Sequence, residues 1–145
     1  MSTDKISTGI ERILRQCSRM SLLFVEDDAI IRAEMVELFE DIFSEVVVED
    51  DGIEGLEQYQ AFYRRRQRYP SLVFTDMSMP RLSGLEMSKR IVEISPGQPI
   101  VVMTAHREED IIIDFLGHGI AHVLFKPLNL DQLYRTLGTV SQSTR

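Results

Sequence analysis

Residues 71–84 read SLVFTDMSMPRLSG, and this stretch decides the fold. It opens with a short run of mostly apolar residues without polar alternation, which is typical of a strand buried on both faces of a parallel sheet. The run ends at a carboxylate, Asp76, and a loop containing Pro80 then leads into a segment with helical periodicity. This order predicts one strand–helix unit of an α/β protein, with Asp76 at the sheet edge where ligands bind.

The same pattern recurs on both sides of this stretch, where short strand-like runs alternate with segments of helical periodicity. The further runs span 22–25, 46–49, 100–103 and 123–125, and the helical segments span about 31–42, 52–68, 85–94, 111–116 and 130–140. In the second helical segment, the apolar residues predicted to share one side are Ile53, Leu56, Tyr59 and Tyr63. The alternation predicts a doubly wound parallel sheet of five strands.

The α/β pattern covers residues 21–145, which is long enough for one domain with a substantial core. Residues 1–20 lie outside this pattern and are predicted to form an N-terminal helical extension. Its apolar residues recur at helical spacing: Ile6, Ile10, Ile13, Leu14 and Cys17. The extension is expected either to pack on the domain or to serve as a docking or dimerisation arm.

The composition is that of a globular protein with an acidic balance. Of the 145 residues, 43% are hydrophobic and 27% are charged, and the formal net charge is −7. This balance disfavours direct nucleic-acid binding, because phosphate contacts need Lys and Arg. The single cysteine, Cys17, allows no intrachain disulfide and is expected to pack in the core. The sequence shows neither a membrane span nor a signal peptide, so we expect a cytoplasmic protein without membrane contact.

Acidic residues stand at the ends of two predicted strands. Glu26, Asp27 and Asp28 follow the first run, and Asp76 ends the third. Neighbouring carboxylates repel one another, and Mg²⁺, which prefers hard oxygen ligands, would offset their charge. An acidic triplet is also typical of a solvated loop or a helix N-cap, and Asp28 suits the cap of a helix that begins near Ala29.

Two further polar residues stand at equivalent strand ends. Thr104 follows the fourth run, where its hydroxyl could bond its own turn or donate to a phosphate. Lys126 ends the fifth run and needs an anionic partner, which the carboxylates supply. The bond from Lys126 to Pro127 is a candidate cis peptide. Together the acids, hydroxyl and ammonium predict a Mg²⁺-dependent phosphoryl-transfer site, with Asp76 as metal ligand or nucleophile.

Four motifs in this chain resemble, in order and spacing, the receiver domain of two-component response regulators over about residues 20–142. The motifs are FVEDD (24–28), TDMSMPRLSG (75–84), VMTA (102–105) and FKP (125–127). The resemblance implies a flavodoxin-like fold with strand order 2-1-3-4-5. It also implies a phosphoacceptor signalling switch rather than a conventional turnover enzyme.

The resemblance further implies the acceptor, the metal ligands and the donor. Asp76 would be phosphorylated, and Glu26, Asp27 and Asp76, together with the Ser78 carbonyl, would hold Mg²⁺ or Mn²⁺. The phosphoryl donor would be a phosphohistidine on a sensor histidine kinase or on a histidine phosphotransfer protein.

Among the remaining site positions, Thr104 would be the switch hydroxyl and Lys126 would pair with the phosphate. Val123 stands where the family often has a large aromatic residue that swings inward on activation, so the usual aromatic–threonine coupling is not expected here. Ser78 and His106 each lie two residues after a site residue, at positions that modulate dephosphorylation in the family.

Two other function classes stay open on the residues alone. A phosphatase of the haloacid-dehalogenase type also uses an aspartate nucleophile, Mg²⁺, a threonine and a lysine, but it carries a second aspartate where this chain has Ser78. An interaction module with a vestigial site is the other alternative, and negligible Mg²⁺ affinity would favour it.

Two surface patterns also allow more than one interpretation. Leucines and a valine at 130, 133, 137 and 140 suit core packing, a homodimer seam, or a helix that leads into an output domain. Four arginines within residues 64–68 suit a solvated helix end or a patch for docking a partner.

Overall fold

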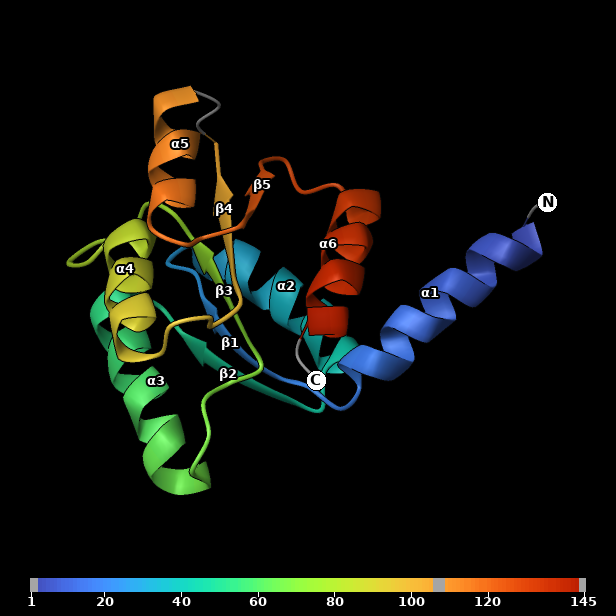
Figure 1. Ribbon diagram of the computed structural model, residues 1–145, viewed down its shortest axis with the longest axis horizontal. Coiled ribbons are helices and arrows are strands. Elements are labelled where there is room, and N and C mark those ends of the chain that lie inside the picture. Colours follow the sequence, from blue (N-terminus) through green and yellow to red (C-terminus); the bar gives the residue numbers. More distant parts are fainter. Residues whose placement is uncertain (1–2, 106–108, 144–145) are drawn as a thin grey trace.

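The computed structural model describes residues 3–105 and 109–143. Within them, five strands form one parallel sheet in the order β2-β1-β3-β4-β5 (Figure 1). The strands are β1 (Ser21–Val25), β2 (Glu45–Glu49), β3 (Leu72–Asp76), β4 (Ile100–Thr104) and β5 (His122–Phe125). The predicted fold class and strand order are confirmed.

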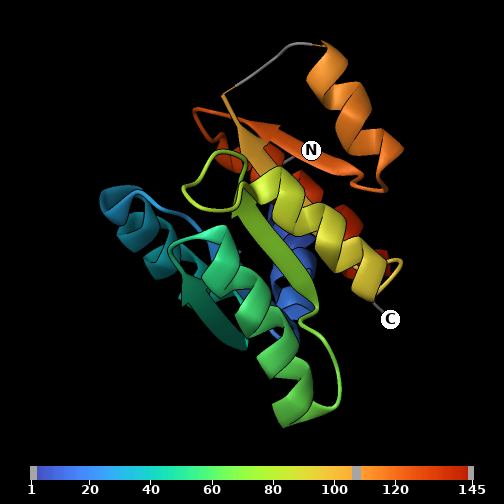
Figure 2. The ribbon, with the colours of Figure 1, turned by 90° about the vertical axis from the view of Figure 1, so that its left-hand side faces the viewer.

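Helices cover both faces of the sheet, as Figures 1 and 2 show. One face carries α2 (Ala29–Ile42) and α6 (Leu130–Ser143), and α1 (Thr3–Cys17) adjoins α6. The other face carries α3 (Gly52–Arg66), α4 (Gly84–Ile94) and α5 (Glu109–Gly117). None of the helices in the described residues is both long and apolar enough to cross a bilayer.

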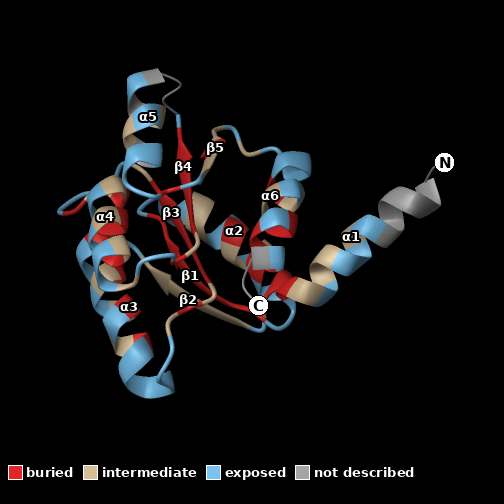
Figure 3. Ribbon diagram, in the orientation of Figure 1, coloured by how far each residue is buried: buried red, intermediate tan, exposed pale blue. Residues whose placement is uncertain are grey.

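The central strands are buried along their whole length (Figure 3), which is why their sequences are continuous apolar runs. Alternate residues feed two separate cores. On the α2 side, Phe24, Phe39 and Phe74 pack with ring centroids 5.1–5.9 Å apart. On the α3 side, residues such as Val25 and Val73 meet Met87 of α4.

The side of α3 that the apolar spacing predicts is only partly the buried one. The structure buries Gly52, Gly55, Tyr59 and Phe62, whereas Ile53 and Tyr63 are 38% and 41% exposed. The two glycines shift the buried row, because a Cβ at position 55 would lie 2.7 Å from the Met87 sulfur. Because the two glycines lack side chains, this face of α3 lies close to its neighbours and is buried, although its hydrophobicity alone does not predict burial.

The second half of α1 packs on the domain. Ile13 and Leu14 lie against the core, Cys17 is fully buried, and the Ser141 hydroxyl donates to the Gln16 side chain over 2.7 Å. Burial raises the pKa of the Cys17 thiol to about 11, which keeps it protonated and unreactive. The predicted packing role of Cys17 is confirmed.

Gly84, at the start of α4, is required by the loop that follows β3. A Cβ at this position would lie 1.9 Å from the carbonyl oxygen of Asp76, while the Gly84 amide donates to Met77 over 2.7 Å. We expect Gly84→Ala to lower the free energy of unfolding by about 2 kcal/mol or more, because the backbone must shift. Gly117→Ala is the matched control, since nothing lies within 4 Å of the added carbon. Equal stability of the two variants in urea unfolding would contradict this account.

Candidate functional site

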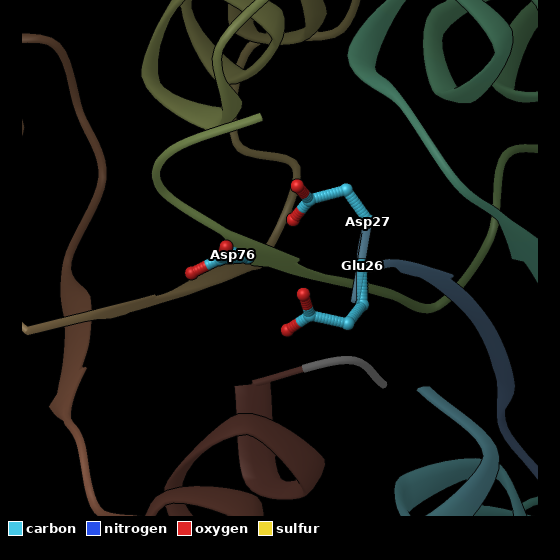
Figure 4. A group of neighbouring side chains, drawn as sticks. All are labelled: Glu26, Asp27 and Asp76. Carbon is cyan, nitrogen blue, oxygen red and sulfur yellow. The ribbon is translucent and has the colours of Figure 1, made fainter. Parts of the chain in front are cut away.

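The carboxyl ends of β1 and β3 bring three carboxylates together (Figure 4). Because Val25 pairs with Thr75 in the parallel register, the residues that follow each of them become neighbours at the sheet edge. Carboxylate oxygens of Glu26, Asp27 and Asp76 all lie within 4.8 Å of one another. Residues separated by 49 positions in the chain therefore form one acidic cluster.

Glu26 is the most buried member, with none of its surface exposed. Its Oε2 accepts the Asp28 amide over 3.0 Å, whereas its Oε1 is buried without a hydrogen-bond partner among the described residues. Burial raises the pKa of Glu26 to about 7; the Asp28 amide opposes this effect, and the charge of Asp76 adds to it. A buried oxygen without a donor fits a metal ligand.

The third acid of the triplet has a structural task. Asp28 caps α2, and its Oδ1 accepts the amides of Ile30 and Ile31 over 2.9 and 3.0 Å, which confirms the predicted N-cap. Arg32 then donates to the Glu26 carbonyl over 2.9 Å. Cap and arginine together hold the chain so that Glu26 and Asp27 face the cluster.

Lys126 supplies the positive charge of the site. Its Nζ lies 2.9 Å from Asp76 Oδ1, and the peptide bond to Pro127 is cis, as the sequence suggests. Burial raises the pKa of Asp76, and the hydrogen bond and charge of Lys126 oppose that rise. Burial lowers the pKa of Lys126, but Asp76 and the other two acids more than offset it, so its pKa is raised. Each member of the pair therefore favours the charged form of the other.

Thr104 ends β4 beside this pair and is almost fully buried. Its Oγ1 contacts the Met77 sulfur at 3.4 Å, and its carbonyl accepts the Lys126 amide over 2.8 Å. The same register that places Asp76 opposite Met103 thus brings the hydroxyl to the edge where Asp76 and Lys126 meet.

The positions expected to modulate the site differ in how exposed they are. Ser78 is exposed in the loop after β3. Val123 is half-buried on β5, where it packs against the core on the α4 side of the sheet. His106 lies outside the described residues.

An ion pair that the sequence does not reveal fixes the loop carrying Ser78. Arg81 has a φ of 68° and donates to Asp51 over 2.7 and 3.1 Å, and to Glu54 over 3.3 Å. Asp51 also caps α3 by accepting the Glu54 amide. No local pattern marks this contact, because its partners are 30 and 27 residues away.

The donor set fits a hard divalent cation. Three carboxylates converge on one point, one of their buried oxygens lacks a donor, and a single ammonium group offsets only part of their charge. Mg²⁺ and Mn²⁺ take oxygen ligands of this kind, commonly with waters and phosphate oxygens completing the shell.

The raised pKa of Glu26 predicts a pH dependence of stability without metal. The folded pKa of about 7 lies above the ordinary 4.5, so the folded state holds the proton more tightly. The free energy of unfolding should therefore fall as the pH rises from about 5 to 8, by up to about 3 kcal/mol.

Glu26→Gln should remove this pH-dependent loss of stability. Glu37 is an exposed acid on α2, and Glu37→Gln should leave the loss unchanged. An identical pH profile for wild type and Glu26→Gln would contradict the burial of this carboxylate.

Comparison with known proteins gives consistent matches. The family profile described as response regulator receiver domain matches residues 22–138. The chain is 25% identical over 119 residues to the chemotaxis protein CheY of Listeria monocytogenes, covering 81% of this chain and 95% of that protein. It is 28% identical over 127 residues to the transcriptional regulatory protein ZraR of Klebsiella oxytoca, covering 88% of this chain but only 27% of that protein.

A solved structure shares the fold. The receiver domain of the histidine kinase CKI1 from Arabidopsis thaliana, complexed with Mg²⁺ and BeF₃⁻, superimposes with a TM-score of 0.74 at 24% identity. The match covers 92% of this chain and 97% of that one.

Proposed function

The chain belongs to the response regulator receiver domain family, the signalling switches of two-component systems, and on that premise we propose that Asp76 is its phosphoacceptor. One observation carries the assignment. The Asp76 carboxylate ends a central strand, is 5% exposed, and lies both 2.9 Å from a lysine and within the acidic cluster. It is therefore held where an incoming phosphoryl group meets a cation, and no other carboxylate in the described residues has this setting.

Glu26, Asp27 and Asp76 would hold Mg²⁺ or Mn²⁺, with the Ser78 carbonyl as a further ligand. The bound cation would supply neutralising charge to phosphoryl oxygens. Two observations support this proposal: the orphaned oxygen of Glu26, and the Mg²⁺ and BeF₃⁻ in the CKI1 receiver domain.

In the phosphorylation step, an Asp76 carboxylate oxygen forms a bond to phosphorus while the phosphorus–nitrogen bond of a phosphohistidine breaks. The electron pair stays on the imidazole nitrogen of the donor, and an acyl phosphate forms on Asp76. Lys126 favours the ionised form of the attacking carboxylate and then pairs with phosphoryl oxygens. Catalysis depends on positioning and charge stabilisation, which is what phosphoryl transfer mostly requires.

The new phosphoryl group adds a charge of about −1.5 to −2 at the sheet edge. We propose that the Thr104 hydroxyl turns from Met77 to donate to a phosphoryl oxygen, and that this movement changes the surface formed by α5, β5 and α6. Because Val123 places no large aromatic ring three residues before Lys126, we propose that the change runs through the β4 end itself. Ser78 and His106 would modulate the lifetime of the phosphorylated state.

The partner is proposed to be a sensor histidine kinase or a histidine phosphotransfer protein. Receiver domains interact with histidine kinases as a family, and the match to ZraR, of which this chain spans about a quarter, fits pairing with an output domain. A homodimer and a cytoplasmic location remain predictions from the sequence.

Acetyl phosphate, a small acyl phosphate donor, tests the proposal without the cognate kinase. With Mg²⁺ or Mn²⁺ the protein should acquire one phosphoryl group that is stable to mild acid and labile to hydroxylamine, and EDTA should stop the labelling. Labelling that is unaffected by EDTA would contradict the metal site. Repeated turnover of p-nitrophenyl phosphate would instead indicate a phosphatase.

A further inference from the structure

A polar cavity lies at the end of the sheet opposite to the acidic cluster. Its volume is about 460 Å³, within the range of about 300–1,000 Å³ that small-molecule sites occupy. Three arginines from separate positions line it: Arg19 between α1 and β1, Arg66 at the end of α3, and Arg68 before β3. We call it the basal arginine cavity; its polar floor is formed by Ser21, Ser44 and Ser71.

The basal arginine cavity has an excess of positive charge in a chain of net charge −7. Its one acidic lining residue, Glu45, is paired with Arg66 over 2.9 Å. Arg19 and Arg68 have no carboxylate within 4.0 Å in the part of the chain that the structure describes. Two guanidinium groups are thus left to bind something other than the protein.

The floor of the cavity offers a further hydrogen-bond donor. The Ser21 amide donates to Ser71 Oγ over 3.0 Å, and the Ser71 amide donates to Ser21 Oγ over 3.1 Å. Both hydroxyl oxygens are therefore already acceptors. The two hydroxyl oxygens lie 3.4 Å apart, and only one of the two hydroxyl groups can donate its hydrogen to the other. One hydroxyl hydrogen is left without an acceptor within the described residues, although Ser21 is only 7% exposed.

A favourable interaction with the α3 dipole accounts for the position of only some of these arginines. Cations at the end of α3 complement its carboxyl terminus, which accounts for the side chains at 64–66. Arg19 and Arg68 lie outside the helix, and they reach the same cavity from other segments.

We propose that the basal arginine cavity binds a small polyanion that carries phosphate groups. The side chains of Arg19 and Arg68 and one serine hydroxyl offer donors without a carboxylate partner, so the ligand should be rich in acceptors. The guanidinium fork matches phosphate oxygens in a bidentate way, and two free forks call for more than one phosphate. A half-open polar hollow of this volume suits a small anion better than it suits an extended acidic chain. This proposal is independent of phosphorylation at Asp76, which lies at the other end of the strands.

Inorganic pyrophosphate is the probe, titrated into the protein by calorimetry in buffer containing EDTA, so that the acidic cluster cannot take part through a metal. We expect saturable binding at one site. The double variant R19Q/R68Q should bind at least about tenfold more weakly, since each arginine contributes charge-assisted hydrogen bonds. Inorganic phosphate should bind more weakly than pyrophosphate to the wild type.

The control is the double variant R90Q/R135Q, which removes the same charge from exposed positions on α4 and α6 and should bind pyrophosphate like the wild type. Both double variants should keep the wild-type melting temperature. Absence of saturable binding, or equal weakening in the two double variants, would overturn the proposal. Equal affinity for phosphate and pyrophosphate would show that a single anion suffices and would overturn the polyanion assignment.

Discussion

Asp76→Asn is expected to abolish phosphoryl labelling by acetyl phosphate. The substitution keeps the size of the side chain but replaces the nucleophilic carboxylate with an amide, which cannot form the acyl phosphate. We expect the labelling rate to fall by at least about 1,000-fold, which is to the detection limit, because among the described residues no other carboxylate has both the lysine and the acidic cluster beside it. Intact-mass spectrometry of the protein after incubation with Mg²⁺ and acetyl phosphate measures this directly.

Asp131→Asn is the matched control for that experiment. Asp131 is an exposed carboxylate in the first turn of α6, paired with Arg135 over 3.1 Å, and it is not a member of the acidic cluster. This variant should label like the wild type. If Asp76→Asn still gains one phosphoryl group at a comparable rate, the phosphoacceptor is another residue.

Lys126→Met should give the second-largest effect. Met keeps much of the apolar stem but removes the ammonium group that lies 2.9 Å from Asp76. We expect the rate of labelling to fall about 100-fold, because preorganised charge that stabilises the transferring phosphoryl group is lost. Without metal, the pKa of Asp76 should also rise further, since burial would then act without the opposing lysine.

Lys89→Met controls for the loss of a paired lysine elsewhere. Lys89 lies between Glu86 and Asp114, at 3.5 and 3.7 Å, on the α4–α5 surface. Its replacement should leave the labelling rate unchanged. Rates for Lys126→Met within twofold of the wild type would mean that Lys126 only balances charge in the resting protein.

The sheet and the acidic cluster could be predicted from the sequence for the same physical reason. Strands buried on both faces must be continuous apolar runs, so β1, β3 and β4 stand out in the chain. Parallel strands in register then end together, which places residues 26, 76 and 104 along one edge without any knowledge of side-chain packing.

The features that sequence analysis missed depend on contacts between distant segments. The buried row of α3 follows from glycine-mediated approach to α4, which hydrophobic spacing does not encode. The pairing of Arg81 with Asp51 requires a left-handed backbone at residue 81 and a helix cap 30 residues earlier. The arginines of the basal arginine cavity come together only where the α1–β1 connection lies beside the end of α3 and the segment before β3. From the sequence alone, the arginine run at 64–68 therefore suits only a helix end or a docking patch.

Trapping the phosphorylated residue chemically is the most direct test of the central claim. Borohydride reduces an aspartyl phosphate to homoserine, a permanent mark that tandem mass spectrometry assigns to a single position. After labelling with acetyl phosphate and Mg²⁺, we predict homoserine at position 76 in the wild type and no such mark in a sample treated with EDTA. A reduced side chain at Glu26, Asp27 or any other carboxylate, with position 76 still aspartate, would contradict the account.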